Sequence, residues 1–176
     1  MVKTATTGRE TVLTRSNEVD GDGDDDREVI AEFVTGAITL LEEADTQLAS
    51  PGGVPSDMAA LTAAYRAFRT IRGLARFLRF EGLEVLAQAS EDLLFEACCG
   101  RTALRTASTD MVRQSVSVLR RHVLDIGSAL TDGKPVPRPV RLAPGLVRDM
   151  QQAVHSNHST YVEDDDAAAA MDRHVA

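Results

Sequence analysis

The stretch that decides the fold is Tyr65–Phe80, which reads YRAFRTIRGLARFLRF. On a helix turning about 100° per residue, its apolar side chains share one face and its arginines share a neighbouring face. The apolar set is Tyr65, Phe68, Ile71, Ala75 and Leu78. The basic set is Arg66, Arg69, Arg72, Arg76 and Arg79. Like charges at this spacing cost roughly 0.2–0.5 kcal/mol per pair, so the basic face predicts compensating negative charge nearby.

Three other segments, 27–50, 83–97 and 109–130, repeat the apolar period of three or four residues and predict helices. Breaker and capping residues separate them. The helix that contains the arginines should begin after Ser56 as N-cap, and a turn is expected around Gly82. Gly100 and Asp132-Gly133 should end the third and fourth helices, and Ser108 or Thr109 should cap the start of the fourth.

Four amphipathic helices with short connections predict an all-α protein, an up-down antiparallel four-helix bundle over residues 27–133. Residues 1–26 end in an acidic run and are expected to be a disordered lead-in, because they show no apolar period. Asp20, Asp22 and Asp24 alternate as in a calcium loop, but the glycine and the final glutamate of that loop are missing. Residues 134–176 predict a Pro-rich linker, a short helix at 145–154 and a disordered tail.

Composition bounds the function. A formal net charge of −8 argues against nucleic-acid binding, which depends on neutralising phosphates. No apolar run reaches the roughly 20 residues of a membrane span, so we expect a cytoplasmic protein away from the membrane. Cys98 and Cys99 are adjacent, which makes a disulfide between them unfavourable. His155 and His158 lack a third ligand and His174 is terminal, so no metal site and no cofactor is expected.

Two motifs resemble a known family. Residues 65–78, YRAFRTIRGLARFL, look like the signature F-R-x-x-H-T-[IL]-K-G-x-[AS]-G-F-L of histidine-containing phosphotransfer (HPt) domains, above all the N-terminal domain of the chemotaxis kinase CheA. Residues 86–94, LAQASEDLL, look like that family's L-A-H-x-x-E-[DN]-L-L. The resemblance covers about residues 27–132. It implies a helical bundle of HPt type in a two-component phosphorelay or chemotaxis system.

The departures from the family's motifs concern its chemistry. Arg69 matches the histidine that accepts the phosphoryl group, and a guanidinium has no free lone pair to attack phosphorus. The other matches are the family's lysine at Arg72, its glycine at Gly73, its second histidine at Gln88, its ring-orienting glutamate at Glu91, and two small residues at Arg76 and Arg79. The resemblance therefore implies a pseudo-HPt domain that accepts no phosphate and is not an enzyme.

Two interpretations of the arginine stripe stay open. The arginines could form a solvated face balanced by carboxylates of the bundle, with Glu91 within reach of Arg69 or Arg72. Three further carboxylates are expected to balance the charge of the arginines: Glu81, Glu84 and Asp92. Alternatively, the stripe is a docking face for a response-regulator receiver domain, whose acidic pocket meets HPt helices, or for a histidine kinase. A partner helix, an anionic lipid or nucleic acid are weaker candidates.

A second class of function is a competent phosphotransfer protein, or a fragment derived from a kinase, that uses another histidine. His122 is the candidate, on the fourth predicted helix between apolar neighbours and without a following Lys-Gly. The chain ends at Ala176 with no room for an ATP-binding domain, so a kinase in its own right is not expected.

Overall fold

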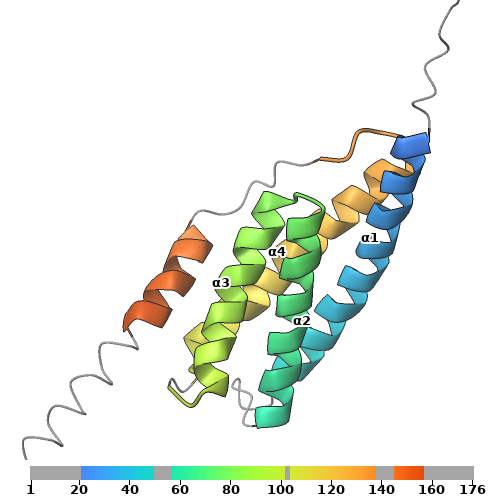
Figure 1. The fold of residues 1–176 in the computed structure, drawn as a ribbon. Helices are drawn as coiled ribbons and strands as arrows, with labels where there is room; N and C mark the ends of the chain where they lie inside the picture. The colour runs from blue at the N-terminus through green and yellow to red at the C-terminus, as the bar shows by residue number, and fades with distance from the viewer. Residues whose placement is uncertain (1–20, 50–56, 102–103, 138–144, 157–176) are drawn as a thin grey trace, which may run out of the picture.

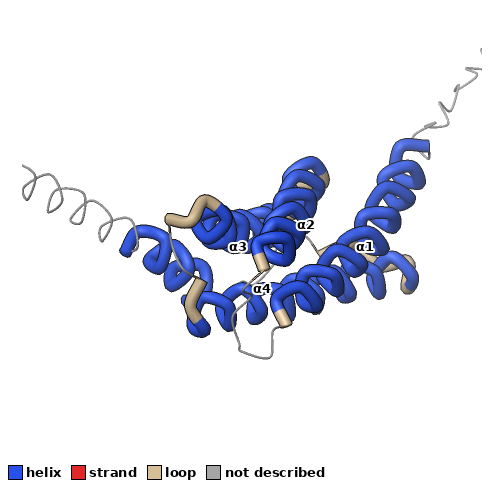
Figure 2. The backbone as a smooth tube through the Cα atoms, turned by 90° about the horizontal axis from the view of Figure 1, so that it is seen from below, coloured by secondary structure: helices blue, strands red, loops and turns tan. Residues whose placement is uncertain are grey.

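The bundle consists of four long helices in a computed structural model that describes residues 21–49, 57–101, 104–137 and 145–156. They are α1 (Gly21–Leu48), α2 (Met58–Phe77), α3 (Glu81–Cys98) and α4 (Thr106–Thr131). A fifth helix spans residues 145–156. Each long helix runs antiparallel to the one before it (Figure 1). The described residues contain no strand (Figure 2), so the predicted all-α bundle with a short fifth helix is confirmed.

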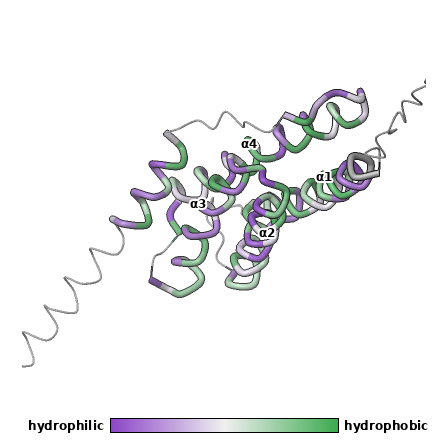
Figure 3. The backbone as a smooth tube through the Cα atoms, turned by 45° about the horizontal axis from the view of Figure 1, so that its top comes forward, coloured by the Kyte–Doolittle hydropathy of each residue, from purple (hydrophilic) through white to green (hydrophobic). Residues whose placement is uncertain are grey.

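The core forms where the apolar faces of the helices meet. Apolar and polar residues alternate along each helix with its period (Figure 3). α2 packs against α1 and α3, and α4 also packs against α1 and α3. α2 and α4 are therefore diagonally opposite in the bundle. The largest fully buried side chains are Phe68, Phe80, Leu41, Leu48, Ile71, Leu83, Leu86, Leu93, Leu94, Leu119, Ile126 and Met150. Each helix therefore contributes the face that its apolar period predicts.

α1 begins at Gly21 rather than at Arg27, so the end of the predicted acidic lead-in is helical. Asp25 and Asp26 lie in its second turn, close to the positive end of the helix dipole, with which carboxylates interact favourably. Arg27 donates a hydrogen bond from Nη2 to the carbonyl of Leu130 at 2.9 Å, which ties the start of α1 to the end of α4. The rest of the predicted lead-in, residues 1–20, lies outside the described residues.

The junction between α2 and α3 differs from the prediction of a helix through Phe80 and a turn at Gly82. α2 ends at Phe77, and Arg79 adopts a left-handed backbone with φ of 59°. The amide of Phe80 donates to the carbonyl of Ala75 at 2.8 Å, and that of Arg79 donates to Arg76, which is the Schellman pattern of helix ends. Gly82 instead lies in the first turn of α3. The burial of Phe80 against Phe33, with ring centroids 5.6 Å apart, explains this early stop.

The other helix ends test the capping predictions. Asp57, not Ser56, caps α2, and its carboxylate accepts a hydrogen bond from the amide of Ala59 at 2.9 Å. α4 begins at Thr106 after Arg105, so Ser108 and Thr109 lie buried in its first turn and are not its caps. Gly100 and Gly133 follow α3 and α4 with φ of 69° and 68°, which confirms both predicted helix stops.

Hydroxyl groups occupy the buried seam between α3 and α4. Ser90 Oγ and Ser115 Oγ share a hydrogen bond of 2.7 Å, and both residues are fully buried. Of the two hydroxyl protons, one joins the two oxygens, and the other is donated to a carbonyl of its own helix, either from Ser90 to Leu86 or from Ser115 to Val112. The pair places a polar contact inside an otherwise apolar interface without leaving either hydroxyl unsatisfied.

The helix at 145–156 lies on the α3–α4 side of the bundle (Figures 1 and 2). Leu146 and Met150 are buried, so the predicted short helix docks on the bundle. The predicted disordered tail falls on residues 157–176, outside the described part of the chain. Among the described helices, none has the length and apolar character that crossing a membrane requires. Cys98 and Cys99 are free, as expected.

Candidate functional site

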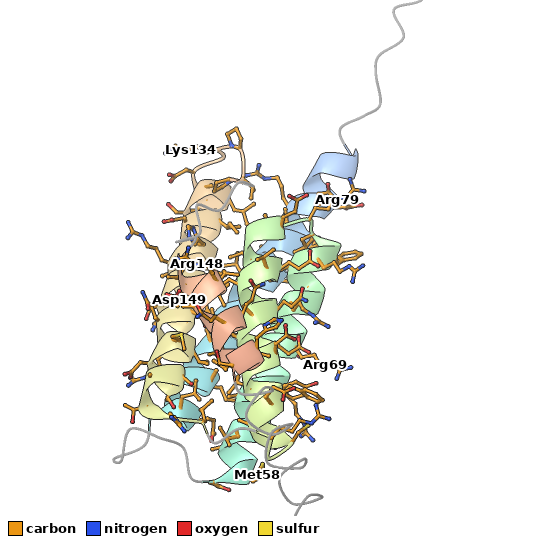
Figure 4. The ribbon with its side chains drawn as sticks, turned by 90° about the vertical axis from the view of Figure 1, so that its left-hand side faces the viewer. Met58, Arg69, Arg79, Lys134, Arg148 and Asp149 are labelled. Carbon is orange, nitrogen blue, oxygen red and sulfur yellow. The ribbon has the colours of Figure 1, made fainter. Side chains whose placement is uncertain are left out.

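The basic face of α2 consists of Arg66, Arg69, Arg72 and Arg76. Arg66, Arg69 and Arg76 are exposed, and Arg72 is half-buried beside α3. The opposite side of the helix is anchored in the core by Phe68 and Ile71, which fixes the direction of the arginines. Figure 4 shows Arg69 projecting away from the bundle. The predicted stripe therefore exists over the helical part of the stretch.

Arg79 does not belong to this face, which corrects the predicted stripe of five arginines. Its left-handed backbone lies beyond the end of α2, so its side chain no longer follows the period of the helix. Figure 4 shows Arg79 near the end of the bundle, well separated from Arg69. The reason is the Schellman turn, which the apolar period of the sequence does not reveal.

Glu91 of α3 supplies the predicted compensating charge. Its Oε2 lies 3.0 Å from Arg72 Nη1, while the Glu91 side chain is only 8% exposed. Burial raises the pKa of Glu91 above its ordinary value of 4.5, Arg72 opposes this rise, and Asp92 adds to it. The Oε2 atom receives no well-aligned hydrogen bond in the described residues, so the contact is an ion pair rather than a directed hydrogen bond. The prediction that Glu91 faces Arg69 or Arg72 is confirmed for Arg72.

The remaining charges on this side interact more weakly. Arg76 Nε lies 3.9 Å from Glu84 Oε1, and the Arg76 side chain is 79% exposed. Such exposed pairs contribute roughly 0–1 kcal/mol. Burial raises the pKa of Asp92, with Arg72 opposing. Of the four carboxylates expected beside the stripe, Glu91 makes the close, buried pair and Glu84 a long, exposed one.

Arg69 is held by Tyr65, a residue that the helical period places on the apolar face of α2. Its Nη1 donates a hydrogen bond to the hydroxyl of Tyr65 at 3.0 Å, one turn earlier. The ring of Tyr65 packs against Phe95 of α3 at 5.9 Å between centroids, and Arg101 lies over Phe95 at 5.9 Å. The spacing of four residues between Tyr65 and Arg69 is the signal that could have predicted this hydrogen bond.

Gly73 and Gln88 complete the set of motif positions, and both are exposed. A Cβ added at Gly73 would meet nothing within 4 Å. Packing therefore does not require glycine there. Because Gly73 follows Arg69 by one turn and precedes Arg76, its missing side chain leaves open space between two exposed guanidinium groups.

The histidines lie elsewhere. His122 is half-buried on α4, across the diagonal from α2, so the fold does not bring it to Arg69. His155 lies on the helix at 145–156 rather than in a tail, and its Nδ1 is 2.7 Å from the carbonyl oxygen of Gln151. His158 and His174 are outside the described residues. Within the described ranges, no cluster of three or more His, Cys, Asp and Glu side chains could hold a metal ion.

The chemistry of this face is that of an anion-binding surface. A guanidinium stays protonated and offers five donors in a planar fork, which suits carboxylate and phosphate oxygens. Arg72 is committed to Glu91, while Arg69 uses one of its donors on Tyr65. The exposed cations left to meet a partner are Arg66, Arg69 and Arg76.

The comparisons with known proteins give one relative and no family model. The chain is 28% identical over 114 residues, 63% of its length, to the sensor histidine kinase CheAY of Helicobacter pylori (strain ATCC 700392 / 26695). The match covers 14% of that kinase's length, so the chain spans only a small part of it. No family model matches, and no solved structure matches significantly. The chain is similar to a CheA-type histidine kinase, as the motifs predicted; its assignment as an HPt domain stays a prediction.

Proposed function

We propose that the chain is an HPt-like binding module of a chemotaxis-type two-component system, with Arg69 in the place of the phosphoacceptor histidine. The similarity to CheAY supports the signalling class. The observation that carries the proposal is the pair of Arg72 with the buried Glu91 beside an exposed Arg69. In HPt domains the matching glutamate orients the reactive histidine, whereas here Glu91 pairs with Arg72, at the position of the family's lysine, and Arg69 donates to Tyr65 instead.

The absence of phosphotransfer follows from the chemistry of position 69. A neutral imidazole can attack phosphorus near pH 7, whereas a guanidinium remains protonated. Arg69 donates one hydrogen bond to Tyr65, and its remaining guanidinium donors stay available to a partner. The module then acts through binding alone, as a non-catalytic adaptor.

The exposed arginines favour an acidic partner. A receiver domain presents a pocket of carboxylates, and its phosphorylated form adds phosphate oxygens. Arg69 and Arg76 flank the open space at Gly73, which leaves room for a partner to approach the helix backbone. We therefore assign the receiver domain of a response regulator, or the histidine kinase that carries one, as the partner of this face.

A binding titration against the receiver domains of the same organism tests this role. Changing Arg69→Glu together with Arg76→Glu reverses two exposed charges and should weaken binding to one receiver domain at least about tenfold. The matched control is Arg121→Glu with Arg148→Glu, two exposed arginines on α4 and on the helix at 145–156. Equal binding by both double variants would contradict the proposed face.

The alternative function is phosphotransfer through His122, and a labelling experiment distinguishes it from the proposed one. The chain is incubated with an autophosphorylating kinase of the same organism and labelled ATP. We expect no label, because His122 is half-buried and lies on α4, which does not pack against α2. Acid-labile label that disappears in His122→Ala would show a competent phosphotransfer protein.

A further inference from the structure

A groove of about 340 Å³ lies where the start of α1 meets the turn between α2 and α3. It is lined by Asp26, Val29, Ile30, Phe77, Leu78 and Arg79. None of these residues belongs to the basic face proposed above. The groove's volume is at the lower end of small-molecule sites, which span roughly 300–1,000 Å³, so it suits one or two side chains better than a large ligand.

The groove is bordered by apolar side chains that the chain leaves in solvent. Phe77 is 74% exposed and Val29 is 42% exposed, while Ile30 behind them is buried. Both exposed side chains line the same groove, so a partner that covers it would remove their apolar surface from water. Phe77 is the side chain that projects most, and it lies at the edge of the cavity.

Arg79 on the rim occupies a costly backbone position. With φ of 59° it stands at the first position after the helix cap, where glycine is the usual and least strained residue. An arginine in this left-handed conformation has a higher conformational free energy than a glycine would have, and it places a long basic side chain beside the groove. The strain therefore points to a use for the guanidinium.

The rim also carries both signs of charge. Asp26 and Arg79 border the same cavity, and in the described part of the chain neither is within 4.0 Å of an oppositely charged group. The surface thus offers one projecting ring, one cavity, one free acid and one free base. A copy of the same surface, related by a twofold axis, supplies the complement of each.

We propose that this groove is the interface for a second copy of the chain. Phe77 of each copy enters the groove of the other, and Arg79 of each copy pairs with Asp26 of its partner. The arrangement is isologous, so every contact occurs twice. Phe77, Arg79 and Asp26 are not part of the basic face of α2, so this interface and the proposed docking of a receiver domain use different residues.

Sedimentation equilibrium of the full chain tests the interface over a range of concentrations. We expect a dimer whose dissociation constant rises about tenfold or more in Phe77→Ala, because a central aromatic side chain is lost. Asp26→Arg and Arg79→Asp should each weaken self-association, since each places like charges opposite one another. Asp tolerates the left-handed backbone better than most residues, so Arg79→Asp should not disturb the turn. The control reversal is Arg121→Asp on α4.

Mixing the two charge-reversed chains gives the decisive result. A heterodimer of Asp26→Arg with Arg79→Asp restores both ion pairs, whereas each variant alone has none. We expect the equimolar mixture to associate more tightly than either variant by itself. Circular dichroism of each variant serves as the control for folding.

Three results would overturn the proposal. A chain that stays monomeric at high concentration would exclude a second copy as the occupant of the groove. A dimer unaffected by Phe77→Ala would place the interface elsewhere. A mixture that associates no better than its components would exclude the crossed pairing of Asp26 and Arg79.

Discussion

Two seams of the bundle, α1–α4 and α2–α3, use ion pairs in opposite ways. Between α1 and α4, Arg120 pairs with Glu42 at 2.9 Å, and all four side chains of this and the neighbouring Arg113 pair are about half exposed. Between α2 and α3, Arg72 pairs at 3.0 Å with Glu91, which is almost fully buried. The distances match, but only the second seam removes a carboxylate from water. The distance between the charges therefore does not show which ion pair has the larger effect on stability. The desolvation of its charges shows it.

Removing the cation from the buried pair should give the largest effect. Arg72→Ala leaves the Glu91 charge without a partner, and we expect the free energy of unfolding to fall by about 2 kcal/mol. This is below the roughly 3–5 kcal/mol of fully buried pairs because Arg72 is itself partly exposed. Urea denaturation at pH 7 measures the loss.

The matched control for this loss is Arg120→Ala, which breaks an exposed pair across the other seam and should cost only about 0–0.5 kcal/mol. Adding Glu91→Gln to Arg72→Ala should recover part of the lost stability, because it removes the unpaired charge. Equal losses for Arg72→Ala and Arg120→Ala would remove the distinction between the seams.

Substitutions of glycine also distinguish α2, beside the α2–α3 seam, from the α1–α4 seam. Gly73→Ala should stabilise the protein by about 0.5–1 kcal/mol, because alanine is the better helix former and nothing lies within 4 Å of the added methyl. On the other seam, a methyl at Gly127 would lie 3.1 Å from Val34 Cγ1, so crowding should cancel the gain. Thermal unfolding of both variants measures the difference. Similar gains would show that the α1–α4 seam is looser than its geometry indicates.

The pH dependence of stability should report on Glu91. Burial raises the pKa of Glu91 in the folded chain above 4.5, so the folded state binds the proton more tightly than the unfolded state. As the pH falls from neutral toward the ordinary value, this group's contribution to stability increases. The free energy of unfolding of the wild type should therefore rise relative to that of Glu91→Gln, measured at pH 7 and pH 5. A constant difference would mean that Glu91 titrates normally.

The sequence predicted those features that depend on one helix at a time. The apolar periods placed the helices, and Gly100 and Gly133 marked two of their ends correctly. The Arg72–Glu91 contact was also foreseen, but through a resemblance rather than from spacing. Local pattern and motif were enough for the basic face from Arg66 to Arg76.

The features that depend on packing between helices were missed. Nothing in the run from Leu78 to Phe80 shows that Phe80 will stack on Phe33, yet this contact ends α2 early and moves Arg79 off the stripe. The groove also requires α1 to begin at Gly21, before its apolar period starts. Both features arise from tertiary contacts across segments far apart in the chain.

The buried hydrogen bond between Ser90 and Ser115 fixes more than the seam in which it lies. Sliding α3 along α4 would break this hydrogen bond, whose loss costs about 0.5–1.5 kcal/mol. The bond thus favours one axial register of α3 against α4. Glu91 is the next residue along the same helix, so a shift in this register would also move Glu91 relative to Arg72.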